Sequence, residues 1–443
     1  MTPRIVTAAF AAALVAGAAL RVSVLRVAVL AVDDSWRAWS YHAATTGTAH
    51  MYGPRGHTVR FGAIDAPVVY PPLALDELGV VGRIYARLRG GRFPDDDGLT
   101  IAIKSTILLF DAAMTLLLYR TLRRTAGRRE AQFGAAMYWL NPAVLYATSL
   151  GYVDALVALP AAAAVIAASS AHAAAAGALI AAAVMTKPQG IFIAPSVALA
   201  LWNGGARLEA AARERTAVLA AAAIGIALVA PMVAAGTLWY MLRSVAVLAG
   251  HNMLSALAFN GWWIVGYLFA AAAVTAEGGG PAAALAAQPP VLTHAYAIEH
   301  GLPHPRLIAL ALLVPVVCWA LYRARAAADL GLHAAVAAFI VVAYFVLSVQ
   351  VHENHFFLAI PLLTLAAALR PTFAPVAAAL SVTFALNLAL TYGWAGQLPS
   401  TTRLPIVGID ATVIVAVANC GLLAWFAAIL ARVCRGKTAG AIG

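Results

Sequence analysis

The amino-acid sequence predicts an all-α polytopic membrane protein, and two observations carry that prediction. Hydrophobic residues make up 63% of the 443 residues, whereas charged residues make up only 11%. Soluble domains carry about 25% charged residues. In addition, apolar runs close to the roughly 20 residues that cross a bilayer as a helix recur from one end of the chain to the other. A soluble core cannot bury that much apolar surface.

The apolar runs predict about twelve transmembrane helices, within a range of 11 to 13, in a single membrane domain over residues 1–443. The predicted spans lie near residues 5–31, 99–120, 131–147, 153–170, 173–186, 190–202, 216–235, 306–322, 330–349, 356–369, 372–391 and 407–431. Twelve spans place both termini on one side of the membrane. The basic loops at 119–130, 206–214 and 323–329 fall on that side, which the positive-inside rule identifies as cytoplasmic.

Charge and cysteine content exclude two classes of protein. The net charge of +11 fits the basic cytoplasmic loops, so we expect no nucleic-acid partner. The three cysteines are Cys318, Cys420 and Cys434, of which two lie inside apolar runs and one in a basic tail. This distribution does not indicate a disulfide framework.

Two long segments face the outside in this topology, residues 32–98 and residues 236–305. Long loops in a compact membrane bundle are usually either disordered or functional. The first is rich in Tyr, Trp, His, Asp and Arg rather than in Gly and Ser. We therefore expect an ordered loop that carries short interfacial helices and contributes to the active site.

The second outer segment contains an ambiguous apolar stretch at residues 258–276. The stretch is apolar enough to span the membrane, but a single extra span would move the basic residues 323–325 to the outside. Trp262, Trp263 and Tyr267 suit the interface between membrane and water. We therefore favour an interfacial or re-entrant helix.

Polar residues gather at the outer ends of several different predicted spans. They are Asp33 and Asp34 after the first span, Asp154 at the start of the fourth, Lys187 and Gln189 between the fifth and sixth, and His352, Glu353 and His355 between the ninth and tenth. Ionisable residues near the hydrocarbon layer are costly and are usually kept for ions, substrates or partner charges. The topology therefore predicts a site where carboxylates and cations meet.

Lys187 is the most informative of these cations, since the chain has only three lysines. A lysine near the end of a span can simply extend its ammonium group into the interface. Here Pro188 follows directly and stops the helix, which leaves backbone donors free beside the charge. That arrangement suits an anion.

The segment from His352 to His355 permits three interpretations. It is either a solvated turn, a phosphate-binding segment or part of a metal site, because histidines three residues apart can share a helix face. No third metal ligand is close in sequence. A divalent metal is therefore possible but not favoured, and we expect no cofactor. Imidazoles and a lysine can each donate a hydrogen bond to a phosphate.

Asp33 and Asp34 are either a solvated helix terminus or a source of general-base chemistry. A carboxylate held near a substrate hydroxyl can take its proton, and apolar surroundings raise its pKa toward a useful range. Adjacent residues point in different directions, so we expect only one of the two to act.

Six motifs follow one another along the chain in a characteristic order. They are the acidic pair after the first span, DAPVVYPPLALDELG at 65–79, WLNPAVLYATSLGYVDALVALP at 139–160, TKPQGIFIAP at 186–195, NMLSALAFNGWW at 252–263 and VHENHFFLAIPLL at 351–363. In this order they resemble the integral-membrane glycosyltransferases of the GT-C class, which take sugars from polyprenyl phosphates. The resemblance covers most of the chain and implies the GT-C fold.

The resemblance implies an inverting transfer at the outer face of the membrane. Some enzymes of this class use a divalent metal with paired acids, so the pair Asp33 and Asp34 keeps a metal possible, although it is not favoured. The catalytic carboxylate of the family precedes an aromatic cluster, here Trp36, Trp39 and Tyr41, which favours Asp34 over Asp33. The implied binding residues for the donor phosphate are Lys187, His352, His355 and Gln189. The implied substrate-binding residues are Tyr70, Asp65, Trp36, Tyr152, Asp154 and Glu353, of which Glu353 can equally orient the cations, as can Gln189.

The resemblance further implies the partners and the location. The donor is a polyprenyl-phosphate-linked hexose, mannose ahead of glucose, and the acceptor is a glycolipid or another glycan. The enzyme is expected in the bacterial inner membrane, with cytoplasmic termini and a periplasmic active site. The alternative is a secondary transporter or lipid-carrier flippase. Such a protein should have ionisable groups at mid-depth in several spans, whereas here the polar groups cluster at one end, apart from Lys104, Asp111 and Asn387.

Overall fold

A computed structural model describes residues 3–27, 30–54, 58–94, 96–203, 207–326, 328–393 and 404–439. Within these ranges the side chains of residues 3, 30–34, 207, 248–249 and 436–439 lie outside the description. The described chain is almost entirely helical, because apolar helices satisfy their own backbone hydrogen bonds without water.

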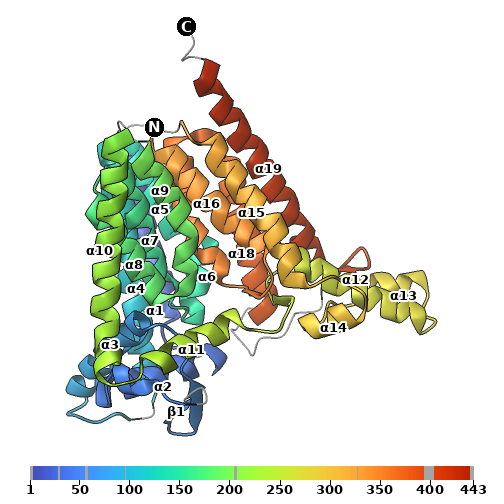
Figure 1. Cartoon of the computed structure of the whole chain (residues 1–443), viewed down its shortest axis with the longest axis horizontal. Coiled ribbons are helices and arrows are strands. Elements are labelled where there is room, and N and C mark those ends of the chain that lie inside the picture. Colours follow the sequence, from blue (N-terminus) through green and yellow to red (C-terminus); the bar gives the residue numbers. More distant parts are fainter. Residues whose placement is uncertain are drawn as a thin grey trace.

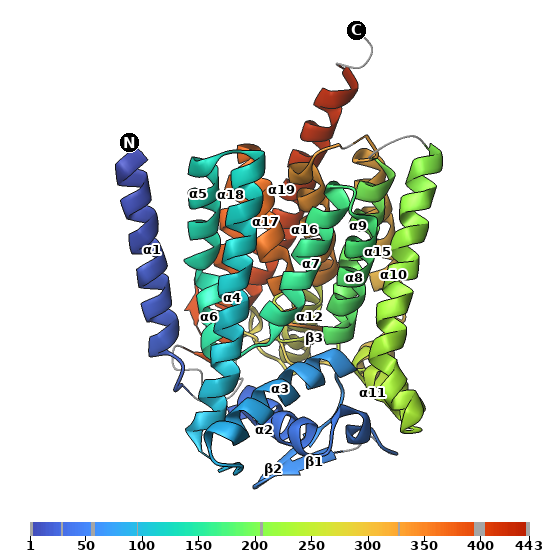
Figure 2. The same cartoon turned by 90° about the vertical axis from the view of Figure 1, so that its left-hand side faces the viewer.

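Most of the helices lie roughly alongside one another and form one bundle (Figures 1 and 2). Its members are α1 (Pro3–Ser23), α4 (Asp97–Thr125), α5 (Arg128–Trp139), α6 (Pro142–Leu150), α7 (Asp154–Ser169), α8 (Ala173–Thr186), α9 (Ala194–Trp202), α10 (Arg207–Ala234), α15 (Pro305–Arg323), α16 (Leu330–Leu347), α17 (Ala359–Leu369), α18 (Ala374–Tyr392) and α19 (Ala411–Ala439). Both termini lie at the same end of this bundle (Figure 1).

The opposite end, here called the loop end, carries the helices and strands that lie outside the bundle (Figure 1). They are α2 (Leu30–Thr45), β1 (Thr58–Phe61), β2 (Ile64–Pro67), α3 (Pro72–Leu88), α11 (Leu238–Ala249), β3 (Ser255–Ala256), α12 (Gly261–Ala276), α13 (Pro281–Leu285), α14 (His294–Glu299), β4 (Val351–His352), β5 (Pro405–Ile406) and β6 (Ile409–Asp410). Short 3-10 helices are η1 (Thr48–Met51), η2 (Pro188–Ile193), η3 (His355–Leu358) and η4 (Pro371–Phe373). Both predicted outer segments therefore contribute folded elements to the loop end.

Helices lie in every predicted span, but the first span, predicted over 5–31, ends as a helix at Ser23, and the separate helix α2 begins at Leu30. The described residues include seven helices long and apolar enough to cross a membrane. The seven are Arg4–Ser23, Asp97–Thr125, Leu208–Ala234, Pro305–Arg323, Leu330–Leu347, Pro371–Tyr392 and Ala411–Arg435. The other predicted spans coincide with shorter helices, including Asp154–Ser169 and Ala173–Thr186. The number of twelve crossings stays a prediction. The segment predicted to be interfacial forms α12, which lies at the loop end beside α13 (Figure 1).

Burial separates the central helix from the peripheral ones. In α16, 89% of the residues in its 18-residue apolar stretch are buried. In the corresponding stretches of α1 and α10, only 11% of the residues are buried. A helix that is apolar on all sides belongs at the centre of a bundle, and one whose apolar surface stays exposed suits a lipid environment. The core is therefore built around α16.

A buried polar network attaches α1 to the bundle. The Arg21 guanidinium lies 3.2 Å from the Asp111 carboxylate and donates to the Trp139 carbonyl at 2.7 Å. Asp111 also accepts hydrogen bonds from the Tyr138 hydroxyl at 2.9 Å and from the Thr148 hydroxyl at 2.7 Å. These contacts supply hydrogen-bond partners to polar groups that water cannot reach.

Replacing Gly177 with alanine is expected to destabilise the protein by about 1–3 kcal/mol, because it overpacks the contact between α8 and α10. A Cβ atom at Gly177 would lie 1.9 Å from the Ala217 carbonyl oxygen. Gly421 in α19 is the matched control, since a Cβ there meets nothing within 4 Å. Gly421→Ala should be neutral or slightly stabilising. Equal thermal unfolding temperatures for the two variants would contradict the close approach of α8 and α10.

Candidate functional site

A cavity of about 920 Å³ lies where η2, α11, β3, β4 and the C-terminal ends of α16 and α18 meet. Its polar lining consists of Tyr70, Tyr152, Lys187, Gln189, Tyr344, Ser348, Gln350, His251, His352, Glu353, Asn354, His355 and Tyr392. Its apolar lining includes Ile191, Phe192, Leu242, Val245, Ala246, Met253, Leu257 and Val291. The cavity thus combines an apolar wall with a group of ionisable side chains.

The backbone at Lys187 follows from the proline that comes after it. Pro188 disfavours helical backbone at the preceding residue, so α8 ends at Thr186 and Lys187 is extended, with φ −155° and ψ 131°. The chain then restarts in η2, which brings Gln189 to the cavity. The turn therefore delivers two polar side chains between two apolar helices.

Lys187 forms a buried ion pair with Asp154. The Lys187 ammonium lies 2.7 Å from the Asp154 carboxylate, and both side chains are 5% exposed. The second Asp154 oxygen accepts from the Asn354 amide at 3.0 Å. Burial lowers the pKa of Lys187, but the negative charge of Asp154 and the hydrogen bonds of Asp154 and Tyr70 outweigh this effect, so the pKa is raised above its usual value. Lys187 is therefore positively charged at neutral pH, and the Asp154 carboxylate partly balances its charge.

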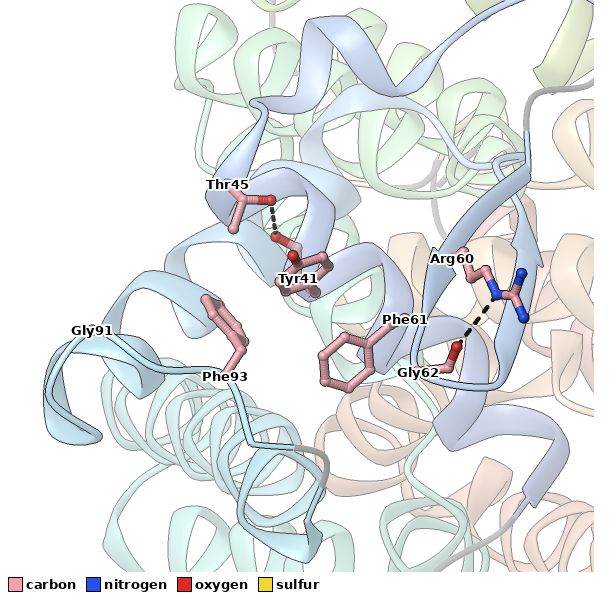
Figure 3. Close-up of a pocket in the computed structure, with 7 residues that line it drawn as sticks. All are labelled: Tyr41, Thr45, Arg60, Phe61, Gly62, Gly91 and Phe93. Atoms are coloured by element: carbon pink, nitrogen blue, oxygen red, sulfur yellow. Dashed lines mark hydrogen bonds between the residues drawn. The ribbon is translucent and has the colours of Figure 1, made fainter.

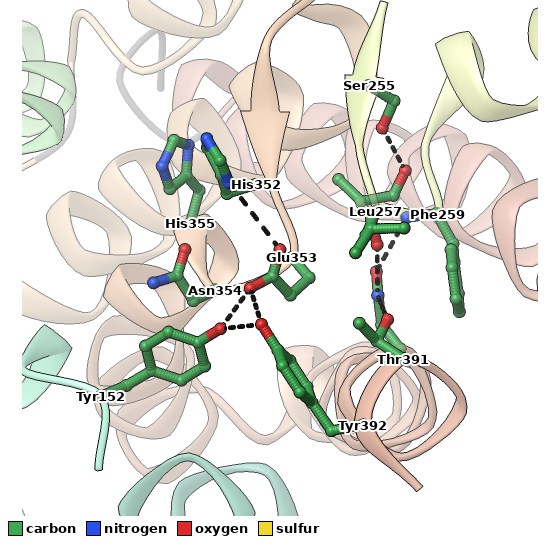
Figure 4. A network of polar contacts seen from close by, with 12 residues as sticks. Tyr152, Ser255, Leu257, Phe259, His352, Glu353, Asn354, His355, Thr391 and Tyr392 are labelled. Atoms are coloured by element: carbon green, nitrogen blue, oxygen red, sulfur yellow. Dashed lines mark hydrogen bonds and ion pairs between the residues drawn. The ribbon is translucent and has the colours of Figure 1, made fainter. Parts of the chain in front are cut away.

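Glu353 is held by two phenols, as Figure 4 shows. The Tyr152 hydroxyl and the Tyr392 hydroxyl both donate to the same carboxylate oxygen, the latter at 2.7 Å. The other oxygen lies 3.9 Å from Nδ1 of His352. The phenols fix the carboxylate while His352, whose pKa is lowered by burial, stays uncharged near neutral pH. Glu353 is thus a positioned hydrogen-bond acceptor.

Replacing Tyr392 with phenylalanine removes one of these donors and should cost about 1.5–3 kcal/mol of stability, the usual range for a hydrogen bond to a charged group. Thermal unfolding of the purified protein measures the effect. Tyr322→Phe is the control, because Tyr322 is 61% exposed and a change there should stay within about 0.5 kcal/mol. The predicted clamp on Glu353 is wrong if both variants unfold like the wild type.

His355 is oriented by hydrogen bonds on both ring nitrogens. Nδ1 lies 2.9 Å from the Tyr344 hydroxyl, and Nε2 contacts the Gln189 amide nitrogen. If the amide donates to Nε2, the ring proton is on Nδ1 and points to the Tyr344 oxygen. The Tyr344 hydroxyl proton is then available to a ligand. Gln189 and Asn354 each have a buried amide oxygen without a partner among the described residues.

A two-residue parallel pairing brings the second outer segment to the site. Ser255 pairs with Val351, and Ala256 pairs with His352. This pairing places His251 beside the histidine segment, with its ring centroid 5.7 Å from that of His352. The His352 and His355 rings are 5.3 Å apart. Three imidazoles therefore line the cavity together with Lys187.

Aromatic contacts connect α2 to the same cavity. The Tyr70 ring contacts Trp36 at 5.4 Å and Trp39 at 5.1 Å between centroids, and the Lys187 ammonium lies 5.8 Å from the Tyr70 centroid. Trp36 thus packs against Tyr70 and does not itself line the cavity. Asp33 and Asp34 are the fourth and fifth residues of α2, and their side chains lie outside the described part of the structure.

The structure brings most of the predicted site residues together. Those that line the cavity are Tyr70, Tyr152, Lys187, Gln189, His352, Glu353 and His355. Asp154 lies behind them and faces Lys187. Asp65 is separate, because it occupies the exposed β1–β2 hairpin, where its 62% exposed side chain is 3.8 Å from Arg60. A cross-strand pairing with Arg60 accounts for this position.

Sequence reasoning did not single out four residues that complete the site, His251, Tyr344, Asn354 and Tyr392. His251 directly precedes the motif at 252–263, and Asn354 lies inside the histidine segment, so both had a local signal. Tyr344 and Tyr392 lie near the C-terminal ends of apolar helices, with nothing in the local pattern to distinguish them. Within the described residues, no group of three or more His, Cys, Asp or Glu side chains is arranged to hold a metal ion.

Comparisons with known proteins find similarity among solved structures. Neither a protein-family model nor a curated protein matches the sequence. Among solved structures, the chain is similar to the oligosaccharyltransferase of Archaeoglobus fulgidus in its apo form, with 13% sequence identity and a TM-score of 0.44. The similarity covers 95% of this chain and 56% of that enzyme, so the chain spans little more than half of its length.

Proposed function

We propose that the protein is an inverting glycosyltransferase of the GT-C class that moves a hexose, mannose ahead of glucose, from a polyprenyl phosphate to a glycolipid or another glycan. One observation carries the proposal, the cavity that joins an apolar wall to Lys187 and three imidazoles. A polyprenyl-phosphate sugar has the same division into a long apolar chain, an anionic phosphate and a polar sugar. The sequence motifs favour the same donor.

The cations suit the charge that develops on the phosphate as the sugar leaves. In the proposed step, the acceptor hydroxyl oxygen attacks the anomeric carbon while the bond from that carbon to the phosphate oxygen breaks. The polyprenyl phosphate leaves with the electron pair. Lys187 carries a positive charge, and the His352 imidazole can donate a hydrogen bond to the phosphate. His355 holds the Tyr344 hydroxyl, whose proton can also be donated to the phosphate. Phosphate is a good leaving group, so no general acid is required.

The proton of the acceptor hydroxyl goes to a carboxylate, for which we propose Asp34, with Asp33 second. Both lie near the start of α2, and the same helix carries Trp36, which contacts Tyr70 at the cavity. A base near the start of α2 would approach the sugar from the side of Tyr70. Positioned bases of this kind contribute about 10²–10⁴-fold to rates.

The apolar wall suits the polyprenyl chain. Ile191 and Leu242 line the cavity and are each 50% exposed, so the wall continues to the outer surface of the protein. In a bilayer that surface meets hydrocarbon. Gln189 and Asn354 offer unpartnered acceptor oxygens, and sugar hydroxyls can donate to them.

The distribution of arginine supports a location of the site at the outer face of the membrane. The basic loops near residues 119–130 and 323–329 connect helices at the end of the bundle that holds the termini (Figure 2), while the cavity lies toward the loop end. Under the positive-inside rule, the termini are cytoplasmic. For a bacterial inner membrane, the cavity then faces the periplasm.

A transporter or flippase is the second candidate, and the mid-depth polar residues argue against it. Asp111 is occupied by Arg21, Tyr138 and Thr148. Asn387 donates to the Leu257 carbonyl and accepts from the Phe259 amide, each at 2.8 Å. Lys104 donates to the carbonyls of Val27 and Ser149. These contacts give each residue a structural role, with no need for a translocation path.

The proposal is tested with purified full-length protein, a lipid extract as acceptor and three separate donors, polyprenyl-phosphate mannose, glucose and arabinose. One donor should be consumed, with release of polyprenyl phosphate and labelling of a lipid or glycan. Heat-inactivated protein is the control. If no donor is consumed but labelled carrier crosses the bilayer of vesicles that contain the protein, the flippase is correct and the transferase is not.

A further inference from the structure

A second cleft, of about 470 Å³, lies at the loop end, apart from the cavity described above. Its lining comes from three segments, α2, the β1–β2 turn and the loop between α3 and α4. The lining residues are Tyr41, Thr45, Arg60, Phe61, Gly62, Gly91 and Phe93, shown in Figure 3. No residue is shared with the lining of the larger cavity.

Aromatic rings form the walls of the cleft. The Tyr41 ring lies 5.0 Å from Phe61 and 5.1 Å from Phe93 between centroids, and Phe61 and Phe93 lie on either side of it (Figure 3). Phe93 also contacts Tyr85, whose hydroxyl donates to Asp96 at 2.8 Å. The walls are therefore held in place from behind. Rings with electron-rich faces attract the polarised C–H groups of a sugar ring.

Polar groups at the rim complete a lining that suits a saccharide. The Arg60 side chain is 71% exposed, and the Asp65 carboxylate, 62% exposed, lies 3.8 Å from its Nε. Nε also donates to the Gly62 carbonyl at 3.3 Å, which leaves the terminal guanidinium nitrogens as donors for a ligand. Within the described residues, the Tyr41 hydroxyl has no hydrogen-bond partner. Gly91 leaves the rim open, because a Cβ there meets nothing within 4 Å.

The hairpin is anchored to α2, which also carries the proposed base. Nε2 of His42 lies 2.8 Å from the Arg60 carbonyl oxygen, which fixes the cleft against the helix. Tyr41 follows Asp34 by seven residues, about 10 Å along a helix. A sugar residue in a glycan chain spans roughly half that length. The cleft therefore lies about two sugar residues from the start of α2.

From this geometry we infer that the cleft binds a saccharide unit of the acceptor, about two residues away from the hydroxyl that receives the new sugar. The inference rests on the proposed glycosyl transfer and extends it, since it assigns the acceptor to a glycan of at least three residues. The sugar ring packs against the aromatic walls that Phe61 and Phe93 form, and its hydroxyls bond to Arg60 and Tyr41.

Binding of defined tetrasaccharides to the detergent-purified full-length protein tests the inference. The probes are α-1,6-linked mannotetraose, β-1,4-linked glucotetraose and β-1,4-linked galactotetraose, measured by saturation-transfer NMR. The variants are Phe93→Ala, which removes one wall, and Arg60→Ala, whose exposed side chain can be removed without disturbing the fold. Phe133→Ala is the control, since Phe133 is 60% exposed on α5, outside the cleft.

At least one tetrasaccharide should bind the wild type, and each cleft variant should raise its Kd at least tenfold while Phe133→Ala leaves it unchanged. The inference is overturned if none of the three binds, or if binding survives in both cleft variants. If the protein consumes a donor but binds none of the tetrasaccharides at the cleft, the inference is wrong and the proposed transfer stands. Binding at the cleft by a protein that consumes no donor overturns the proposed transfer instead.

Discussion

Lys187→Met is expected to destabilise the protein by about 3–5 kcal/mol and to abolish sugar transfer, because it leaves the Asp154 carboxylate buried without its cation. The two groups are 2.7 Å apart, and neither side chain is more than 5% exposed. Thermal unfolding in detergent reports the loss of stability. Transfer from the labelled donor reports the loss of the phosphate-binding charge.

The double variant Lys187→Met with Asp154→Asn separates the two effects. Removing both charges relieves the cost of the unpaired carboxylate, so the double variant should recover much of the stability lost in Lys187→Met. Transfer should stay absent, since the cation is still missing. Wild-type transfer in the double variant would mean that the ion pair is purely structural.

Asp34→Asn is expected to lower the rate of transfer by about 10²–10⁴-fold, the contribution of a positioned general base. Asparagine keeps the size of the side chain but cannot accept the proton of the acceptor hydroxyl. The initial rate of labelling, normalised to the amount of protein in the membrane, measures the effect. Donor binding should be unchanged, because the donor phosphate is assigned to Lys187 and the imidazoles.

Asp33→Asn is the matched control for the base. It makes the same chemical change one residue away on α2 and should keep most of the activity. A large loss in Asp33→Asn with little loss in Asp34→Asn would exchange the two roles. Full activity in both variants would show that neither Asp33 nor Asp34 is the general base.

Much of the helical architecture could be predicted from the sequence, because apolar length determines where a helix can lie in a membrane. The turn at Lys187 and the segment around His352 were also predictable as neighbours, since both interrupt apolar runs at the same end of their predicted spans. Each interruption is a local feature. Topology alone then brings the two segments to one side.

The pairings within the site could not be predicted, because they depend on contacts between distant residues. Asp154 and Lys187 are 33 residues apart, and the sequence suggested a sugar contact for Asp154 rather than an ion pair. His251 reaches the site through a parallel pairing of only two residues, which has no recognisable local pattern. For the same reason, the exposed position of Asp65 depends on the hairpin that carries it.

The central claim is that the 920 Å³ cavity holds a polyprenyl-phosphate sugar. An electron cryomicroscopy structure of the protein with a polyprenyl phosphonate mannose analogue, which cannot be cleaved, tests this claim most directly. The phosphonate should lie about 2.7–2.9 Å from the Lys187 ammonium, the usual length of such a charge-assisted bond, with the prenyl chain along Ile191 and Leu242. A phosphonate bound elsewhere, with no contact to Lys187, would contradict the account.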